Sequence, residues 1–154
     1  MAKPAPVELG QGMTFGQAAA AVVGVRSHEL FACAPHVLDT ADIERVHDMR
    51  VASRRLRAAL EVFAPCFEPK EHRRVLREVK RLADALGARR DPDVQIARLE
   101  ELRAQLAPAE QPGADLLIQR ARDRQAAGNA MLEEALESTL IHDLRARLEE
   151  LSRA

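Results

Sequence analysis

Apolar residues recur every three to four positions along most of the chain between residues 14 and 151. This spacing places them on one face of an α-helix, and the alternation that is typical of β-strands is absent. Ala, Leu, Arg and Glu dominate the composition, and all four favour helix. The pattern therefore predicts an all-α protein, an antiparallel helical bundle of about five helices with short connections.

Capping residues, prolines and glycines predict where the helices begin and end. Thr14 and Gln17 have the spacing of a capping box. Gly87 suits the position just after a helix, and Asp91 with Pro92 suits the start of the next one. Gly128 with its neighbour Asn129 is a weak point in the last helix. The predicted helices are residues 14–34, 40–64 (from Thr40 or Asp42 to Ala64), 68–87, 91–108 and 115–151, in a single domain of residues 14–154 behind a loose tail of residues 1–13.

The stretch RVHDMRVASRRLRAALEVF, residues 45–63, separates its charged residues from its apolar ones. At 100° per residue, one stripe of about 80° holds a histidine and three arginines, over roughly 15 Å of helix. A second stripe of apolar side chains lies opposite, and Val51, Ala58 and Val62 flank the basic stripe on its other side. A stripe with apolar neighbours on both flanks is typical of the floor of a groove that another element walls. Its four members are His47, Arg50, Arg54 and Arg57.

The middle of the chain is basic and the remainder is acidic. Residues 45–90 hold 13 Lys and Arg against 6 Asp and Glu, a net charge of +7, while the whole chain has −1. Guanidinium groups suit phosphate oxygens, and a linear stripe suits a linear polyanion. Glu61 lies four residues after Arg57 and is expected to pair with it. In the alternative interpretation the stripe is a solvated surface, or the acidic C-terminal region folds over it.

No pattern in the sequence predicts catalysis, a cofactor or a metal centre. A nucleophile–base pair and a P-loop are both missing. His28, Cys33 and His36 do not share one helical face, so they are not expected to bind a metal. Asp91 and Asp93 are acids that could hold Mg²⁺, but their ordinary interpretation is an N-cap and a first-turn acid.

The cellular location is predicted from what the sequence lacks. Two cysteines do not form a disulfide framework. No signal-peptide pattern and no apolar run long enough for a membrane span are present, so we expect a cytoplasmic protein and no membrane partner.

Two motifs resemble one known family. The segments VHDMRVASRRLRAALEVF and VKRLADALGARRDPDV resemble the two halves of the signature of the CHAD family, the conserved histidine α-helical domains, and together cover about residues 41–105. The resemblance implies helical bundles around a basic channel, and binding of inorganic polyphosphate. The positions that it implies for binding are His47, Arg50, Arg54, Arg57, Lys80 and Arg90.

The chain departs from that family in length. Family members are commonly about twice as long, with two bundles, whereas this chain carries one histidine motif and resembles half of that two-bundle architecture. We therefore expect a polyphosphate-binding protein without catalytic activity, associated with polyphosphate granules, in which two copies pair to rebuild the channel. Two alternatives stay open: nucleic-acid binding, which the lack of aromatic stacking residues disfavours, and a protein-interaction module that uses the same basic face.

Overall fold

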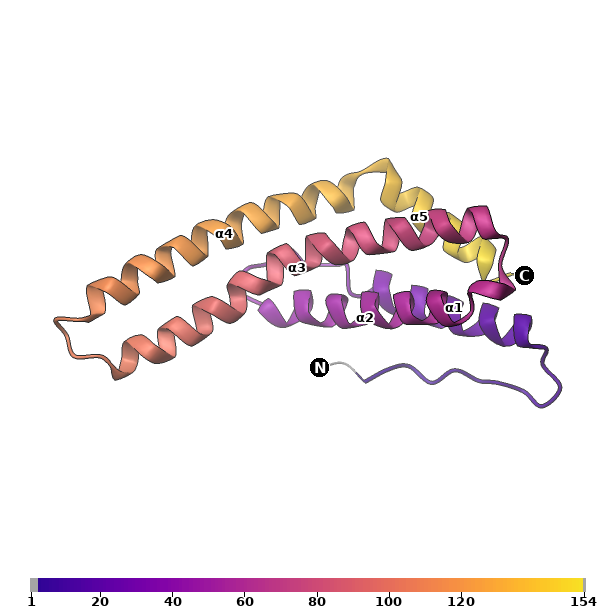
Figure 1. The fold of residues 1–154 in the computed structure, drawn as a ribbon, viewed down its shortest axis with the longest axis horizontal. Helices are drawn as coiled ribbons and strands as arrows, with labels where there is room; N and C mark the ends of the chain where they lie inside the picture. Colours follow the sequence, from indigo (N-terminus) through magenta and orange to yellow (C-terminus); the bar gives the residue numbers. More distant parts are fainter. Residues whose placement is uncertain (1–2, 154) are drawn as a thin grey trace.

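The described part of the chain is an all-helical bundle from which a two-helix arm extends (Figure 1). The computed structural model describes residues 3–153, and the side chains of all of them except residues 139 and 140. Within these residues there are five α-helices, one 3₁₀ turn and no strand, which confirms the predicted fold class. The elements are α1 (Phe15–Ala32), α2 (Ile43–Val62), η1 (Ala64–Cys66), α3 (Pro69–Gln105), α4 (Gln111–Glu137) and α5 (Thr139–Leu151).

The first two helices begin where the capping residues predict. The Thr14 hydroxyl accepts a hydrogen bond from the Gln17 amide at 3.2 Å, and the Gln17 side chain accepts one from the Thr14 amide at 2.9 Å. This is the expected capping box. Asp42 is the N-cap of α2. Both helices end two residues before their predicted ends, at Ala32 and Val62.

Residues 3–13 contain no helix or strand, and they are bound to α1. The amide of Ala5 donates to Glu29 Oε1 at 2.5 Å, and Arg26 Nη2 donates to the Ala5 carbonyl at 3.1 Å. The predicted division into a tail and a domain stays a prediction.

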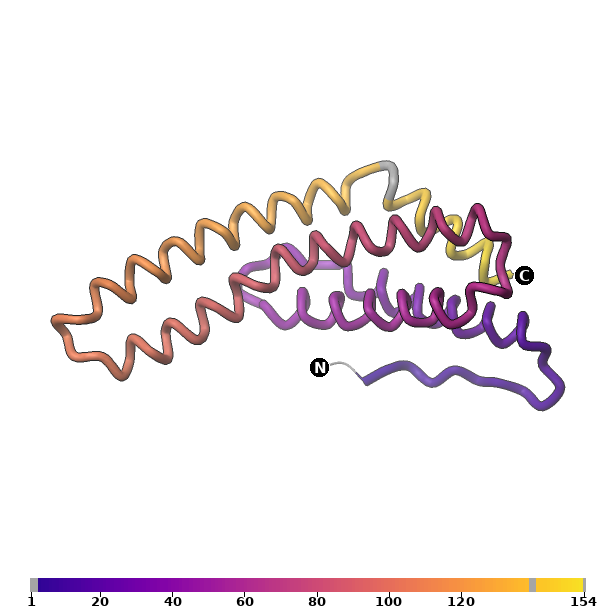
Figure 2. Tube along the Cα trace, in the orientation of Figure 1, coloured from indigo at the N-terminus to yellow at the C-terminus, as the bar shows by residue number. Residues whose placement is uncertain are grey.

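The prediction of separate third and fourth helices is wrong. The trace of α3 runs without a break from residue 69 to residue 105 (Figure 2). Gly87 keeps helical backbone and does not end the helix. Pro92 lies inside the helix, where it removes the N–H that would bond to the carbonyl of Ala88. Packing of α3 along its length against α4 outweighs this local loss.

The weak point predicted at Gly128 and Asn129 is also wrong. Helix α4 passes through both residues and ends at Glu137, because Ser138 has extended backbone. A Cβ atom on Gly128 would lie 2.5 Å from the carbonyl oxygen of Ala88. The glycine therefore allows α4 to approach α3 closely, at the carbonyl that Pro92 leaves without its helical partner. The loop expected around residues 111–115 is helical as well, since α4 begins at Gln111.

The hydrophobic core lies between α1, α2, the first half of α3 and α5. Its fully buried side chains include Leu30, Met49, Leu56, Leu86 and Leu148. Helix α2 runs antiparallel to the first half of α3, and the second half of α3 continues past the start of α2 to form the arm with α4 (Figure 1). One edge of α2 therefore lies beside α3, where both helices are partly exposed.

Candidate functional site

The four residues of the predicted stripe form one row on α2. We call His47, Arg50, Arg54 and Arg57 the basic row. Arg54 and Arg57 are exposed, whereas His47 and Arg50 are half-buried at the edge of the core. Among residues 3–153, no acidic side chain forms an ion pair with the first three members of the row. Within the described residues, Arg50 and Arg54 at the centre of the row therefore lack an acidic counterpart.

Glu61 closes the row at its C-terminal end. Arg57 Nε donates to Glu61 Oε1 at 3.0 Å, which confirms the expected pair. Lys80 Nζ of α3 lies 3.7 Å from the same oxygen, so Lys80 is beside this end of the row. The hydrogen bond from Arg57 lowers the pKa of the Glu61 carboxyl from its ordinary value of 4.5. Glu61 is thus ionised at neutral pH and competes with any other anion for Arg57 and Lys80.

A second line of residues on α3 repeats the spacing of the basic row. Lys80, Ala83, Gly87 and Arg90 are separated by intervals of three, four and three residues, so they share one helical face. We call them the α3 line. Lys80 is exposed, Ala83 and Gly87 are half-buried, and Arg90 is mostly buried. A Cβ atom on Gly87 would have no neighbour within 4 Å, so the middle of this line borders open space.

The antiparallel arrangement places Arg90 near the His47 end of the basic row. His47 precedes Glu61 by 14 residues, which is about 21 Å of helix. Lys80 lies beside Glu61, and 14 residues further along α3 lead to residue 94, one helical turn after Arg90. Lys80 and Arg90, which the family resemblance alone implied, thus lie near opposite ends of the basic row.

Arg90 is mostly buried, and its nearest acid is Asp93. The exposed fraction of the Arg90 side chain is 17%, and its Nη1 atom lies 3.9 Å from Asp93 Oδ2. The Asp93 side chain has no exposed surface. Its Oδ1 atom accepts hydrogen bonds from Arg89 Nη1 and, at 2.7 Å, from Gln125 Nε2. The interpretation of Asp91 as an N-cap and of Asp93 as a first-turn acid is wrong because α3 is continuous here. The Asp93 carboxylate is buried in an ion pair with Arg89.

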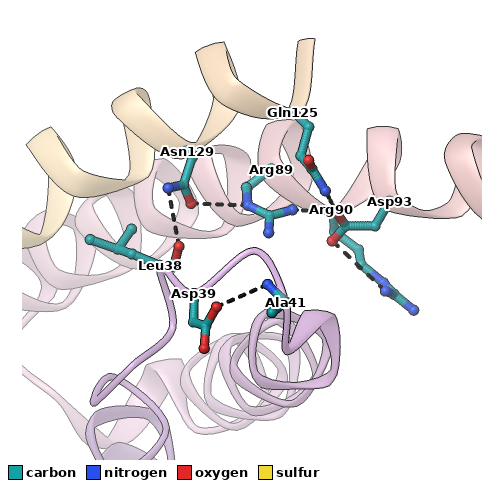
Figure 3. A network of polar contacts seen from close by, with 8 residues as sticks. All are labelled: Leu38, Asp39, Ala41, Arg89, Arg90, Asp93, Gln125 and Asn129. Carbon is teal, nitrogen blue, oxygen red and sulfur yellow. Dashed lines mark hydrogen bonds and ion pairs between the residues drawn. The ribbon is translucent and has the colours of Figure 1, made fainter. Parts of the chain in front are cut away.

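Arg89 connects three parts of the fold (Figure 3). It is completely buried, and its Nε atom donates to Asn129 Oδ1 of α4 at 3.0 Å. Asn129 Nδ2 in turn donates to the carbonyl of Leu38, in the connection between α1 and α2, at 3.2 Å. We call Arg89, Arg90, Asp93, Gln125 and Asn129 the buried network. Sequence reasoning missed it, although the spacing of Arg89 and Asp93 by one helical turn was a usable signal.

The apolar flank of the row is exposed to solvent. Ala58 is exposed, the exposed fraction of Val62 is 67%, and Val51 is half-buried. A shallow pocket beside this flank is lined partly by Pro4 of the N-terminal segment and by Phe63.

Among the described residues of the acidic C-terminal region, none forms an ion pair with the basic row. Helix α5 packs against α1, α3 and α4. Its Arg147 donates to Glu71 of α3 at 3.0 Å.

The other residues considered from the sequence do not converge. Cys33 and Cys66 are free thiols, and burial raises the pKa of Cys33. His28 and His36 are exposed. Within residues 3–153 no group of three or more His, Cys, Asp or Glu side chains is placed to hold a metal ion.

Comparison with known protein families identifies the family of this chain. A family model described as the CHAD domain matches residues 21–154. The chain belongs to the CHAD family. The CHAD match includes the basic row, the α3 line and the buried network, and it confirms the resemblance seen in the two motifs. No curated protein matches this CHAD chain. None of the helices in residues 3–153 combines the length and the apolar character that crossing a membrane requires.

Proposed function

We propose that this CHAD chain binds inorganic polyphosphate along the basic row and does not act on it as an enzyme. One observation carries the proposal: His47, Arg50 and Arg54 have no ion-pair partner among the described residues. Adjacent cations on one helix repel each other unless an anion joins them. Arginine forks bind phosphate oxygens with charge-assisted hydrogen bonds, and a neighbouring imidazole can donate one more.

The shape of the site favours a linear polyanion over a single phosphate. The row extends about 15 Å along α2, with the α3 line beside it. Lys80 and Arg90 supply charge near the two ends, and Gly87 leaves space between them. In this proposal the two helices form a groove that holds successive phosphates of one chain.

Nucleic acid is the less favoured ligand, because the aromatic residues are engaged elsewhere. Binding of single strands generally uses exposed aromatic rings on which bases stack. The sequence has four phenylalanines and no Tyr or Trp. None of the four belongs to the basic row, and only Phe15 is exposed. Phe15 packs on Phe63, Phe67 stacks on His72, and Phe31 lies under the guanidinium of Arg145.

A competition experiment distinguishes the ligands. Labelled polyphosphate would be titrated with the protein, and unlabelled polyphosphate or single-stranded RNA added at equal phosphate concentration, at low and at near-physiological salt. We expect polyphosphate to displace the label at a lower phosphate concentration than RNA, with an affinity that falls as salt rises. Stronger competition by RNA would favour nucleic-acid binding, and no binding at near-physiological salt would favour a role in docking an acidic protein. Polyphosphate chain length, measured after incubation with Mg²⁺, is expected to stay constant.

The proposal includes pairing of two copies. The exposed apolar flank at Ala58 and Val62 runs beside the basic row, so a second copy that packs on it would bring its own row toward the same ligand. We expect light scattering to report a dimer, and Val62→Glu to shift it toward the monomer. A monomer both with and without polyphosphate would contradict this part of the proposal. The cytoplasm, at polyphosphate granules, is the location that we propose.

A further inference from the structure

The buried network contains more positive than negative charge. Two guanidinium groups, Arg89 and Arg90, share one carboxylate, Asp93, and all three side chains are at least four-fifths buried. The other members, Gln125 and Asn129, are neutral amides. A buried charge without a counter-ion is costly, even when its hydrogen bonds are made.

The hydrogen bonds of the network are incomplete at the same place. Arg89 Nη2, Arg90 Nη1 and Asp93 Oδ2 are buried and have no hydrogen-bond partner. The other oxygen of Asp93 is already used twice, by Arg89 and Gln125. A bound water could supply the missing hydrogen bonds, but it would not supply the missing negative charge.

The nearby acid on the connection between α1 and α2 does not complete the network. Asp39 is exposed, and its carboxylate accepts a hydrogen bond from the Ala41 amide at 2.9 Å. Figure 3 shows this carboxylate pointing away from Arg89. The counter-ion that the network lacks must therefore come from outside it.

We propose that Arg90 is an exchangeable arginine, which Asp93 holds in the empty protein and a phosphate of the bound polyanion captures. The inference rests on the proposed function and deepens it. At 3.9 Å the Arg90–Asp93 contact is an ion pair without a hydrogen bond, so Arg90 gives up little when it turns to a phosphate. Asp93 then pairs fully with Arg89, and each guanidinium has one anion. Asp93 is thus a positioning residue that sets the affinity at the His47 end of the row.

A charge-completing substitution tests this exchange. Asn129→Asp would place a carboxylate where Arg89 Nε now donates to an amide oxygen at 3.0 Å. Arg89 would then pair with residue 129, and Asp93 would be free to hold Arg90. We expect the polyphosphate affinity to fall about tenfold. Ala130→Asp adds the same charge at the next, exposed position of α4, and is expected to change the affinity less than about twofold.

The coupling to Arg90 is measured in a double-mutant cycle. In an Arg90→Gln background, Asn129→Asp is expected to cause no further loss of affinity. If Asn129→Asp binds as tightly as the wild type, or loses as much affinity without Arg90 as with it, the exchange is refuted. A wild-type protein that does not bind polyphosphate refutes the proposed function instead.

Thermal melting of the empty protein tests the charge imbalance independently of binding, and also if Asn129→Asp does not fold. Arg90→Gln removes the excess charge, so its melting temperature is expected to equal or exceed that of the wild type. Arg89→Gln removes the ion pair to Asp93 and should lower the melting temperature clearly. Equal losses for the two variants would show that Arg90 is a structural residue and would overturn the inference.

Discussion

Substitution by alanine is expected to lower the stability of the fold at one of two glycines on facing helices and to raise it at the other. At Gly128 a Cβ atom would lie 2.5 Å from the Ala88 oxygen and 3.0 Å from the Arg89 Cα. Both are backbone atoms that cannot rotate away, so α3 and α4 must separate, at a cost of about 3 kcal/mol. The gain in helix propensity offsets about 1 kcal/mol of this. At Gly87 nothing lies within 4 Å, and only the propensity gain of about 1 kcal/mol remains.

Thermal unfolding of the two variants, followed by circular dichroism, measures both effects. A change of 1 kcal/mol shifts the melting temperature of a chain of this length by about 2–4 °C. We therefore expect Gly128→Ala to melt roughly 4–8 °C lower than the wild type and Gly87→Ala about 2–4 °C higher. A Gly128→Ala protein that melts at or above the wild-type temperature would refute the close crossing of α3 and α4. A destabilised Gly87→Ala protein would refute the open space beside the α3 line.

Two further predictions concern single carboxylates. Glu61→Gln removes the anion that occupies Arg57 and Lys80, so polyphosphate should bind about two- to fivefold more tightly in calorimetric titrations; weaker binding would show that Glu61 organises the site. Glu68 caps α3 by accepting the amides of residues 70 and 71, and these bonds lower the pKa of its carboxyl from 4.5. A carboxyl whose pKa is lowered by folding stabilises the fold at pH values above its pKa in the unfolded chain. This stabilisation is lost as the pH falls through its pKa in the folded protein. The melting temperature of Glu68→Ala should therefore lie below that of the wild type at pH 7 and approach it at pH 3, whereas an equal difference at both pH values would contradict the assignment.

Local signals predicted the elements that local contacts form. The capping box at Thr14 and the pair of Arg57 with Glu61 each depend on residues three or four positions apart. The predicted helix breaks at Gly87 and Gly128 are wrong. Both predictions depend on the conformational freedom of glycine, which neither helix uses. At Gly128 the absence of a side chain permits close packing instead, and this contact depends on a backbone 40 residues earlier in the sequence. At Gly87 a Cβ atom would meet nothing within 4 Å, so the helix simply continues through it.

The candidate site also combines residues that a local pattern predicts with residues that only tertiary contacts bring together. The periodicity of α2 alone predicted the basic row, because all its members lie on one helix. Lys80 and Arg90 came only from the family resemblance, since the register of α3 against α2 is a tertiary property. Within the buried network only the pair of Arg89 and Asp93 has a local spacing, of one helical turn. Asn129 lies 91 residues from Leu38 and 40 residues from Arg89, so no local pattern predicts its contacts.

The most direct test of the central claim is polyphosphate binding measured by calorimetry for an Arg50→Ala/Arg54→Ala double variant. A matched Arg98→Ala/Arg120→Ala variant removes the same charge from exposed positions on the arm. If the basic row holds the polyanion, the first variant should lose about a hundredfold in affinity, whereas the control should bind nearly as tightly as the wild type. Equal binding by the two variants would place the ligand elsewhere, or reduce the interaction to net charge, and would contradict the account.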